Sequence, residues 1–365
     1  TYTKFKSDGI HVIIAVKNQE EKIEGFLRSI LFKILYGREE YLKNIIVADL
    51  ESTDNTKEIA RQYTDKVYDY VWCNDFAAAR NFAFSKAGCD YILSVDADEE
   101  LDTYNNKALR NLKAAILPEI DIVQMYYVNG SDFNSVYNVH KELRPKLFKR
   151  IRTFNWISPI HETIQVNPVI YDSNIEIMHK PTGDHSKRDF STYFKALDNK
   201  IHLEDYVVTM LCKELFISGE KDDFIAFRDA FENIFPYENR SDNTLQDITC
   251  ILVRIYQISG DDDKLFKTAL KAVANNPSSE IFLTLGQYYF DKKDYEEAAI
   301  WLYNAAFEAK SILDVASSGR KPLSLLGDCY KNMADICVDD YDRIQYAEMA
   351  DDYYSQAREW QMPEQ

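Results

Sequence analysis

Short apolar runs alternate with amphipathic stretches along the first half of the chain. The apolar runs are rich in β-branched residues, as expected of strands covered on both faces, and they occupy residues 9–16, 44–50, 66–72 and 90–95. Between them, apolar side chains recur at helical spacing in residues 17–35, 51–63 and 74–88. This alternation of strand and helix predicts right-handed crossovers and a largely parallel sheet.

The pattern is less regular after residue 120. Extended segments are predicted at residues 121–128, 142–150, 162–166 and 175–180. We expect them on the far side of the same sheet, with some of them antiparallel. Residues 1–188 are therefore predicted to form one α/β domain.

Helical periodicity dominates the second half, from about residue 189. One set of positions repeats after 33 residues: Val253, Tyr256, Leu265, Ala269 and Ala272 recur as Gly286, Tyr289, Ala298, Leu302 and Ala305. These positions match the tetratricopeptide pattern of paired helices, in which small residues allow close packing. Residues 189–365 are predicted to be an all-α, tetratricopeptide-like domain, with a generic helical bundle as the alternative. Such repeats bind peptides, pack on a neighbouring domain or form homodimers.

The charge balance limits the partners. A net charge of −17 argues against nucleic acid or an anionic membrane as the main partner. A nucleotide is still compatible, because a bound divalent metal can supply positive charge. The six cysteines lack zinc-site spacing, which favours free thiols in a reducing compartment. With no apolar run of membrane-spanning length and no secretory signal, the sequence predicts a cytoplasmic protein without an integral membrane segment. The first residue is Thr1 rather than Met, so a trimmed N-terminus stays open.

A cluster of carboxylates follows the fourth predicted strand, in "YILSVDADEELD" (residues 91–102). Asp49 and Asp54 also follow a predicted strand. In parallel sheets, ligands bind outside the carboxyl ends of the strands. The sequence therefore predicts a ligand site at this edge of the sheet.

The spacing within the cluster indicates a metal. If the strand stays extended, Asp96 and Asp98 point to one side and Ala97 points away. Two hard oxygen ligands suit a divalent cation that also binds water and phosphate oxygens, as in the displacement of a nucleoside diphosphate. His179 is a candidate third ligand for a softer metal such as manganese. The alternative is that Asp98 and the two glutamates after it have no ligand and only occupy the start of a helix, where acidic side chains are favourable.

Five motifs occur in the order and spacing of family 2 glycosyltransferases of the GT-A fold: "HVIIAVKNQEEKIEGFLRSI", "IIVADLESTDNTKEIA", "WCNDFAAARNFAFSKA", "DYILSVDADE" and "RPKLFKRIRTFNWISPIHE". The chain resembles in particular the bacterial members with C-terminal tetratricopeptide-like helices, which include the sublancin-type peptide S-glycosyltransferases. The resemblance covers roughly residues 10–185 by motif and the remainder by architecture only. It implies that residues 1–188 form a GT-A catalytic domain, with a Rossmann-like and mostly parallel sheet that binds a nucleotide sugar.

The resemblance also implies roles for individual residues. Asp49 takes the position that hydrogen-bonds the nucleotide base, usually uracil, and Asp98 takes that of the direct metal ligand, with His179 beside it. Glu162, in the motif His161-Glu162, is the candidate catalytic base. The remaining candidates for binding the nucleotide sugar are Val16, Asn18, Asp75, Arg80, Asp96, Ala97 and Trp156.

Several of these residues have a structural alternative. Arg80 can be a surface arginine of its helix, and His179 can be a structural histidine. Trp156 can stack on a sugar ring or fill the core. The chain also departs from the family pattern where Leu50-Glu51 replaces a glycine, which adds a negative charge near the expected nucleotide.

Together these features predict a metal-dependent, inverting glycosyltransferase that uses Mn²⁺ or Mg²⁺ and a nucleotide sugar, with a UDP-sugar preferred. The acceptor is expected to be a protein, peptide or glycan that offers a hydroxyl or a thiol, and a homodimer through the helical domain is a further option. One alternative is a catalytically inactive tetratricopeptide scaffold. Another is a nucleotidyltransferase, although "AVKNQEEK" lacks the glycine-rich phosphate loop of that class.

Overall fold

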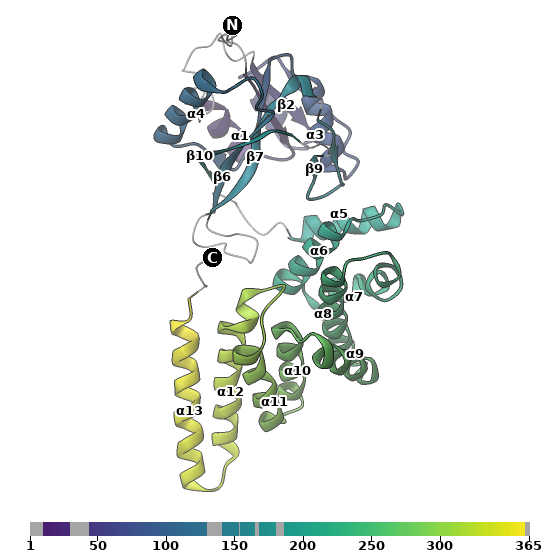
Figure 1. Ribbon diagram of the computed structural model, residues 1–365, viewed down its shortest axis with the longest axis vertical. Coiled ribbons are helices and arrows are strands. Elements are labelled where there is room, and N and C mark those ends of the chain that lie inside the picture. Colours follow the sequence, from purple (N-terminus) through teal and green to yellow (C-terminus); the bar gives the residue numbers. More distant parts are fainter. Residues whose placement is uncertain are drawn as a thin grey trace. The chain divides into compact units, whose positions relative to one another are not determined.

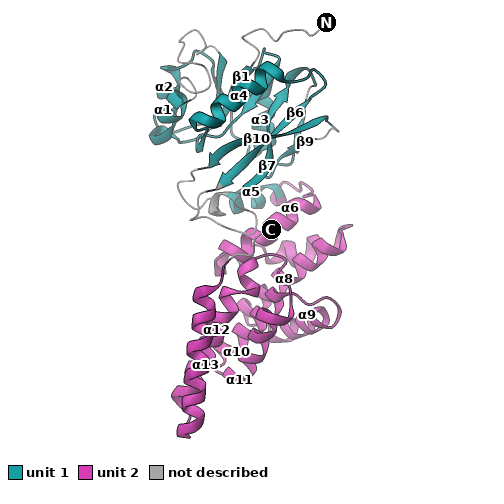
Figure 2. Ribbon diagram, turned by 60° about the vertical axis from the view of Figure 1, so that its left-hand side comes forward, with its two compact units in different colours: residues 1–196 teal, residues 197–365 magenta. Residues whose placement is uncertain are grey.

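The computed structural model describes residues 10–29, 44–129, 141–152, 154–164, 168–179 and 186–361 of the chain. The chain divides into two compact units, residues 1–196 and 197–365 (Figure 2). The sequence placed this boundary after residue 188. Helix α5 (Ser186–Asp198) spans the difference: its Phe190 and Tyr193 are buried, and the Tyr193 ring lies 6.2 Å from that of His161. Most of α5 therefore belongs to unit 1.

Unit 1 contains an eight-stranded sheet in the order β3-β2-β1-β4-β7-β6-β10-β5 (Figure 1). Its first four strands along the chain are β1 (Ile10–Val16), β2 (Ile45–Asp49), β3 (Val67–Asp69) and β4 (Tyr91–Ser94). These four strands run parallel to one another. Every residue of β2 and β4 is buried, as expected of apolar strands that are covered on both faces. The predicted α/β class is confirmed.

The other half of the sheet is mixed. Its strands are β5 (Glu99–Glu100), β6 (Ile122–Asn129), β7 (Lys141–Lys149) and β10 (Ile170–His179). Strand β7 is antiparallel to β4 and β6, β10 is parallel to β6, and β5 is antiparallel to β10. The prediction of far-side strands that are partly antiparallel is confirmed for these segments.

One predicted strand does not join this sheet. Within residues 162–166, only β9 (Thr163–Ile164) is extended, and it pairs with β8 (Trp156–Ile157) in a separate two-stranded hairpin. Residues 165–167 lie outside the described part of the chain. The expectation that this segment extends the main sheet was therefore wrong. The hairpin packs on one face of the sheet instead, because Trp156 and Ile164 join the core beside Phe148 of β7.

Helices cover both faces of the sheet. Side chains alternate across a strand, so Ile14 and Val47 enter one core while Ile13 and Ile46 enter the other. Helices α1, α2 and α4 contribute to the first core, and α3 together with the hairpin contributes to the second. Their bounds are Glu20–Ser29 for α1, Thr56–Arg61 for α2, Phe76–Ser85 for α3 and Thr103–Ala115 for α4.

Unit 2 is helical. Its helices are α6 (Asp205–Ser218), α7 (Lys221–Ala226), α8 (Asp242–Ser259), α9 (Asp262–Asn275), α10 (Ser279–Asp291), α11 (Tyr295–Tyr303), α12 (Arg320–Ile336) and α13 (Asp340–Glu359). Among the described residues, no helix combines the length and the apolar character that a membrane span requires.

The helices of unit 2 pair as the 33-residue repeat predicted. Ala269 of α9 and its equivalent Leu302 of α11 are both fully buried. Gly286 of α10 lies so close to α11 that a Cβ atom there would be 2.6 Å from Cγ of Leu302. Gly327 of α12 is equally close to Tyr354 of α13. Small residues therefore allow the close approach within two helix pairs, and the prediction of tetratricopeptide-like repeats is confirmed.

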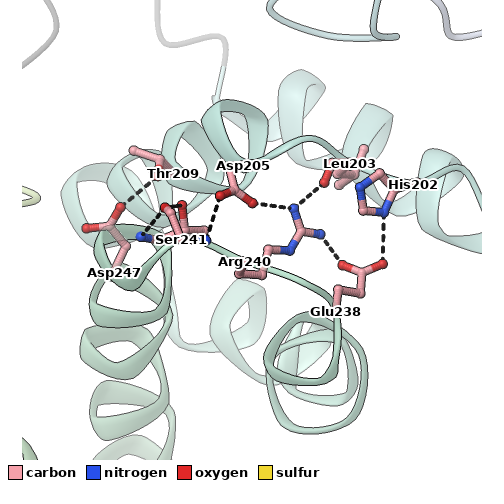
Figure 3. A network of polar contacts seen from close by, with 9 residues as sticks. His202, Leu203, Asp205, Thr209, Glu238, Arg240, Ser241 and Asp247 are labelled. Atoms are coloured by element: carbon pink, nitrogen blue, oxygen red, sulfur yellow. Dashed lines mark hydrogen bonds and ion pairs between the residues drawn. The ribbon is translucent and has the colours of Figure 1, made fainter.

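A polar network joins the start of α6 to the start of α8 (Figure 3). The buried guanidinium of Arg240 donates 2.5 Å to the carbonyl of Leu203 and 3.0 Å to Oδ1 of Asp205. Oδ2 of Asp205 accepts from the backbone N–H of Ser241 at 2.9 Å. Glu238 accepts from Arg240 and also contacts Nδ1 of His202 at 3.0 Å. The network fixes the loop before α8 and gives both terminal nitrogens of the buried guanidinium an acceptor.

Candidate active site

Polar residues gather where the parallel strands end. Strand β1 leads to Asn18, β2 ends at Asp49, and β4 leads to Asp96. Because these three strands are parallel neighbours, their carboxyl ends share one edge of the sheet. Ligands of open α/β sheets bind at such an edge.

The loops around this edge hold non-glycine residues in the left-handed backbone region. They are Asn18 (φ 51°), Glu51 (φ 57°), Asn74 (φ 60°) and, in the loop between β8 and β9, Ser158 (φ 75°) and His161 (φ 50°). Such conformations cost on the order of 1–3 kcal/mol each and cluster at ligand sites. The strain at these five residues is therefore a second indication of a functional edge.

Asp49 is buried at the end of β2. Its Oδ2 accepts a hydrogen bond from the backbone N–H of Ser52 at 3.2 Å. Its Oδ1 is also buried and has no hydrogen-bond partner among the described residues. A buried acceptor without a donor is costly, so Oδ1 is suited to an N–H group of a ligand.

Asn18 connects the loop after β1 to the loop after β2. Its Oδ1 accepts from the backbone N–H of Thr53 at 2.8 Å, and its own N–H donates to Oγ of Ser52 at 3.0 Å. Val16, the other residue predicted here, has its side chain in the core, and its carbonyl accepts from the N–H of Leu50 at 2.8 Å. These contacts hold the two loops together beside Asp49.

Arg80 of α3 and Glu162 of the β8–β9 loop form an ion pair. Nε and Nη2 of Arg80 lie 2.9 and 2.5 Å from Oε1 of Glu162. Nη1 of Arg80 donates to Oγ of Ser94, at the end of β4, at 2.7 Å. Its guanidinium carbon lies 4.7 Å from the centre of the Trp156 ring. Arg80 is therefore enclosed by three segments, which disfavours the alternative of a surface arginine.

The ion pair sets the charge of both groups. Burial disfavours the charged form of Glu162, but the charge and hydrogen bond of Arg80, a backbone hydrogen bond and the charge of His161 together outweigh it and lower the pKa of that carboxyl. Burial also opposes the charge of Arg80, but Glu162, Asp96 and Glu99 together outweigh it and raise the pKa of the guanidinium. Asp96 therefore lies close enough to Arg80 to stabilise its charge.

Helix α3 also positions the β8–β9 loop. Asp75 caps the start of α3 by accepting from the N–H of Ala78 at 2.9 Å, and the N–H of Phe76 donates to the carbonyl of Pro159 at 2.9 Å. Asn81 forms two hydrogen bonds with the backbone of Trp156, at 2.9 and 2.8 Å. Asp75 thus accepts hydrogen bonds from its own helix, at the N–H groups of Ala78 and Ala79.

Trp156 lies in the core. Its indole is buried and packs edge-on against the rings of Phe84 and Phe148. This placement favours the core-filling alternative over stacking on a sugar ring. The buried indole contacts the guanidinium of Arg80 and does not form an open surface.

The acidic cluster lies in a turn and not in an extended strand. Strand β4 ends at Ser94, and Ala97 and Asp98 form a turn that leads into β5. The expectation of an extended segment was therefore wrong, and strand alternation does not orient Asp96 and Asp98. The chain bends because β5 returns antiparallel along β10. Ala97 packs against the core of the sheet.

The helix-terminus alternative fails for this cluster. Helix α4 begins at Thr103, and Asp102 caps it by accepting from the N–H of Asn105 at 2.7 Å. The two glutamates after Asp98 belong to β5. Their position is set by pairing with β10 and not by a helix.

Asp98 and His179, the two predicted metal ligands, are adjacent. Oδ2 of Asp98 lies 3.3 Å from Nε2 of His179, and both side chains are about four-fifths buried. Burial raises the pKa of the Asp98 carboxyl, but the hydrogen bond and charge of His179, together with a backbone hydrogen bond and the charge of Lys22, outweigh it and lower that pKa. The two side chains come from β10 and from the turn before β5.

These two donors fit a divalent cation whose remaining ligands come from elsewhere. Within the described residues, no group of three or more His, Cys, Asp or Glu side chains is arranged to hold a metal. One carboxylate and one imidazole nevertheless suit Mn²⁺, with water and phosphate oxygens completing the shell. The donor set is therefore compatible with a metal that binds together with a nucleotide.

Two contributors were not identified from the sequence. Ser94 accepts from Arg80, and Lys146 of β7 forms a buried ion pair with Glu99 directly after the acidic turn. The signal for Lys146 was a lysine between apolar residues in "RPKLFK", where a strand was already predicted. The signal for Ser94 was a polar residue at the end of an otherwise apolar strand.

A family model described as "Glycosyl transferase family 2" matches residues 11–201. A protein named "TPR repeat-containing protein Synpcc7942_0270", from Synechococcus elongatus, is 40% identical over 72 residues, which is 20% of this chain and 18% of that protein. An "Uncharacterized glycosyltransferase" of Rickettsia felis is 35% identical over 92 residues, which is 25% of this chain and 29% of that protein. The chain thus matches less than a third of the length of these relatives.

Solved structures give weaker similarities. S. aureus TarS 1-349 in complex with UDP-GlcNAc is 13% identical, with a TM-score of 0.37, and the match covers 95% of this chain and 92% of TarS. Glucosyl-3-phosphoglycerate synthase from Mycobacterium tuberculosis, in complex with Mn²⁺, UDP and glucosyl-3-phosphoglycerate, is 15% identical, with a TM-score of 0.37. That match covers 56% of this chain and 79% of the synthase. TM-scores this low carry no argument about fold or substrate.

Proposed function

Because the chain belongs to glycosyl transferase family 2, we propose that it transfers a sugar from a UDP-sugar to an acceptor, with inversion at the anomeric carbon. The observation that carries the proposal is Oδ1 of Asp49, a buried carboxylate oxygen without a hydrogen-bond partner among the described residues. The imide N–H of a uracil ring is a donor of the kind that this oxygen lacks. Family membership also argues against the nucleotidyltransferase alternative.

Asp98 and His179 would hold a divalent cation, Mn²⁺ or Mg²⁺, in this proposal. Their 3.3 Å contact brings a carboxylate oxygen and an imidazole nitrogen together at the strand ends. When bound, the cation supplies positive charge near the leaving nucleoside diphosphate. Asp96, in the same turn, is assigned to the ribose of the donor or to the outer shell of the metal.

Glu162 is assigned the role of catalytic base. Both contacts from Arg80 fall on Oε1, so Oε2 is the oxygen that we assign to the acceptor proton. Arg80 holds the carboxylate in its ionised form, in which it can accept a proton from a hydroxyl or a thiol. A single carboxylate suffices for inversion, because the acceptor attacks the face opposite the leaving group.

The helical unit is assigned to the acceptor, which we propose to be a protein, peptide or glycan. Tetratricopeptide-like repeats present extended surfaces to such partners. A homodimer through this unit is the other use that the repeats support.

Titration calorimetry with UDP, with and without Mn²⁺, tests the proposal. We expect UDP to bind and Mn²⁺ to strengthen the binding. Asp49→Asn should weaken the binding, because an amide has one acceptor oxygen, whereas Asp49 offers one oxygen to the N–H of Ser52 and the other to the ligand. Asp69→Asn, an exposed acid at the end of β3, is the matched control. No binding of UDP in either condition would overturn the proposal, and binding without hydrolysis of any UDP-, GDP- or dTDP-sugar would favour the inactive scaffold.

A further inference from the structure

A buried ion pair lies beside the acidic turn. Glu99, the residue after Asp98, contacts Nζ of Lys146 on β7, and their side chains are 1% and 9% exposed. Taking two charges out of water costs several kcal/mol per ion, so a buried pair is often no more stable than well-packed apolar residues. Stability alone therefore does not explain why Glu99 and Lys146 are charged.

Glu99 holds the turn that precedes it. Its Oε2 accepts from the backbone N–H of Asp96 at 3.1 Å, and its own N–H donates to the carbonyl of Asp96 at 3.1 Å. The other carboxylate oxygen, Oε1, is the one that contacts Lys146. One carboxylate thus ties the backbone of Asp96 to strand β7.

The same residue fixes Asp98 relative to His179. In the antiparallel pairing of β5 with β10, Glu99 lies opposite His179. Nζ of Lys146 also lies 5.5 Å from the centre of the Tyr127 ring. The Tyr127 and His179 rings are 4.8 Å apart. Lys146 therefore contacts both Glu99, which follows the turn, and Tyr127, whose ring packs against His179.

We propose that Glu99 and Lys146 are positioning residues: their buried ion pair sets the turn that places Asp98 beside His179 and so prepares the site for a cation bound with the nucleotide. The role of the pair in metal binding rests on the proposed function. Its role in setting the turn between Asp96 and Glu99 does not. The charge of Lys146 also offsets the repulsion among the neighbouring carboxylates in the absence of a cation.

The test replaces the pair by apolar residues, in the double variant Glu99→Leu/Lys146→Met. Because both members of the pair are removed, neither is left as a buried charge without its partner, and this variant is expected to fold with a melting temperature close to that of the wild type. Loss of a residue that orients metal ligands typically weakens metal affinity about 10–100-fold, and we expect that loss here. Mn²⁺ binding is read by electron paramagnetic resonance in the presence of UDP, which does not depend on turnover.

The matched control is Lys141→Met/Glu176→Leu, which removes an exposed ion pair between the same two kinds of residue on β7 and β10. It should leave Mn²⁺ binding unchanged. Glu99→Gln keeps an oxygen that can accept from the N–H of Asp96, but it leaves the buried charge of Lys146 without its partner. It should therefore lose less Mn²⁺ affinity than the double variant but have a lower melting temperature.

A crystal structure of the double variant gives a second readout. We expect the contact between Asp98 and His179 to lengthen and the turn to shift. Wild-type affinity together with an unmoved turn would overturn the positioning role. If the wild type itself binds neither UDP nor Mn²⁺, the proposed function fails, and the crystal structure alone decides whether Glu99 and Lys146 set the turn.

Discussion

The two units use the left-handed backbone region differently. In unit 2, Gly260 ends α8 in this conformation, and Lys293 adopts it two residues after the end of α10. Helices commonly end in this way, so these positions need no ligand to explain them. In unit 1, Asn18, Glu51 and Asn74 adopt it in loops that follow β1, β2 and β3.

The left-handed residues of unit 2 lie at helix ends and belong to a structural scaffold, whereas those of unit 1 lie in the loops around the candidate site. The helix pairs of unit 2 pack closely through small and apolar residues, as Gly286 against Leu302 illustrates. Oε2 of Glu280 is also buried there without a hydrogen-bond partner among the described residues, but neither backbone strain nor an ion pair accompanies it. The sheet edge instead combines backbone strain, a buried carboxylate oxygen without a partner at Asp49, and the ion pair of Arg80 with Glu162. Substitutions at the sheet edge should therefore lower activity, whereas substitutions in the helical repeats should lower stability.

The largest effect is expected at Glu162. Glu162→Gln keeps an oxygen for Arg80 but removes the base, so the rate of transfer should fall about 10²–10⁴-fold. UDP binding should be preserved, because the base acts on the acceptor. Glu176→Gln, an exposed acid of β10, is the control and should keep full activity. A rate within a factor of two of the wild type for Glu162→Gln would remove Glu162 from the mechanism.

A smaller loss is expected at Asp98. Asp98→Ala removes one ligand of the proposed cation, and the loss of such electrostatic stabilisation should lower kcat about 10²–10³-fold. The dependence of UDP affinity on Mn²⁺, measured by calorimetry, should also disappear. Unchanged turnover in this variant would exclude the metal site described here.

The pH profile of Arg80 variants sharpens the role of the ion pair. The pKa of Glu162 is held below its ordinary value of 4.5, so a base at this position stays active until the pH falls below that value. Arg80→Gln removes the positive charge, raises the pKa of Glu162 and should move the acid limb of kcat/KM to higher pH. Arg80→Lys should move it less.

The same pair makes a prediction for stability. Because the folded-state pKa of Glu162 is depressed, its contribution is present above the pKa of the unfolded chain and is lost as the pH falls through the folded-state value. Acid unfolding of Arg80→Gln should lack this contribution. A profile identical to that of the wild type, in both activity and unfolding, would contradict the importance of the pair.

In unit 2 the effect should fall on stability alone. Gly286→Leu inserts a side chain where a Cβ atom already comes within 2.6 Å of Leu302, and such overpacking costs about 1–3 kcal/mol. Thermal unfolding should report the loss, while UDP affinity should stay unchanged. Gly25→Ala, in α1, is the control, because no atom lies within 4 Å of its added Cβ.

The smallest effect is expected at Glu51. Its Oε2 accepts from the N–H of Trp72 at 3.2 Å, and its charge lies in the loop after Asp49. Glu51→Gln keeps the backbone and an acceptor oxygen but removes the charge, so UDP should bind about 2–5-fold more tightly, as expected of an exposed charge. Glu58→Gln, an exposed residue of α2, should change nothing.

Local pattern was sufficient for the elements of both units. Runs of β-branched residues marked β1, β2 and β4, and the 33-residue repeat marked the pairing of α8 with α9 and of α10 with α11. Side-chain periodicity of this kind depends on neighbours along the chain, so it is visible without coordinates. The motifs also located the edge of the sheet at which Asp49 and Asp96 lie. The roles assigned to them at that edge remain predictions.

What the sequence alone determined is therefore the order of strands and helices, the parallel half of the sheet and the residues that gather at its carboxyl edge. Only the tertiary structure decided that the acidic cluster bends into a turn, that Trp156 is core, and that Arg80 meets Glu162 and Lys146 meets Glu99. The two ion pairs join segments that are far apart in the chain. The energy of a buried charge depends on which partner the fold brings to it, and no spacing along the sequence records that.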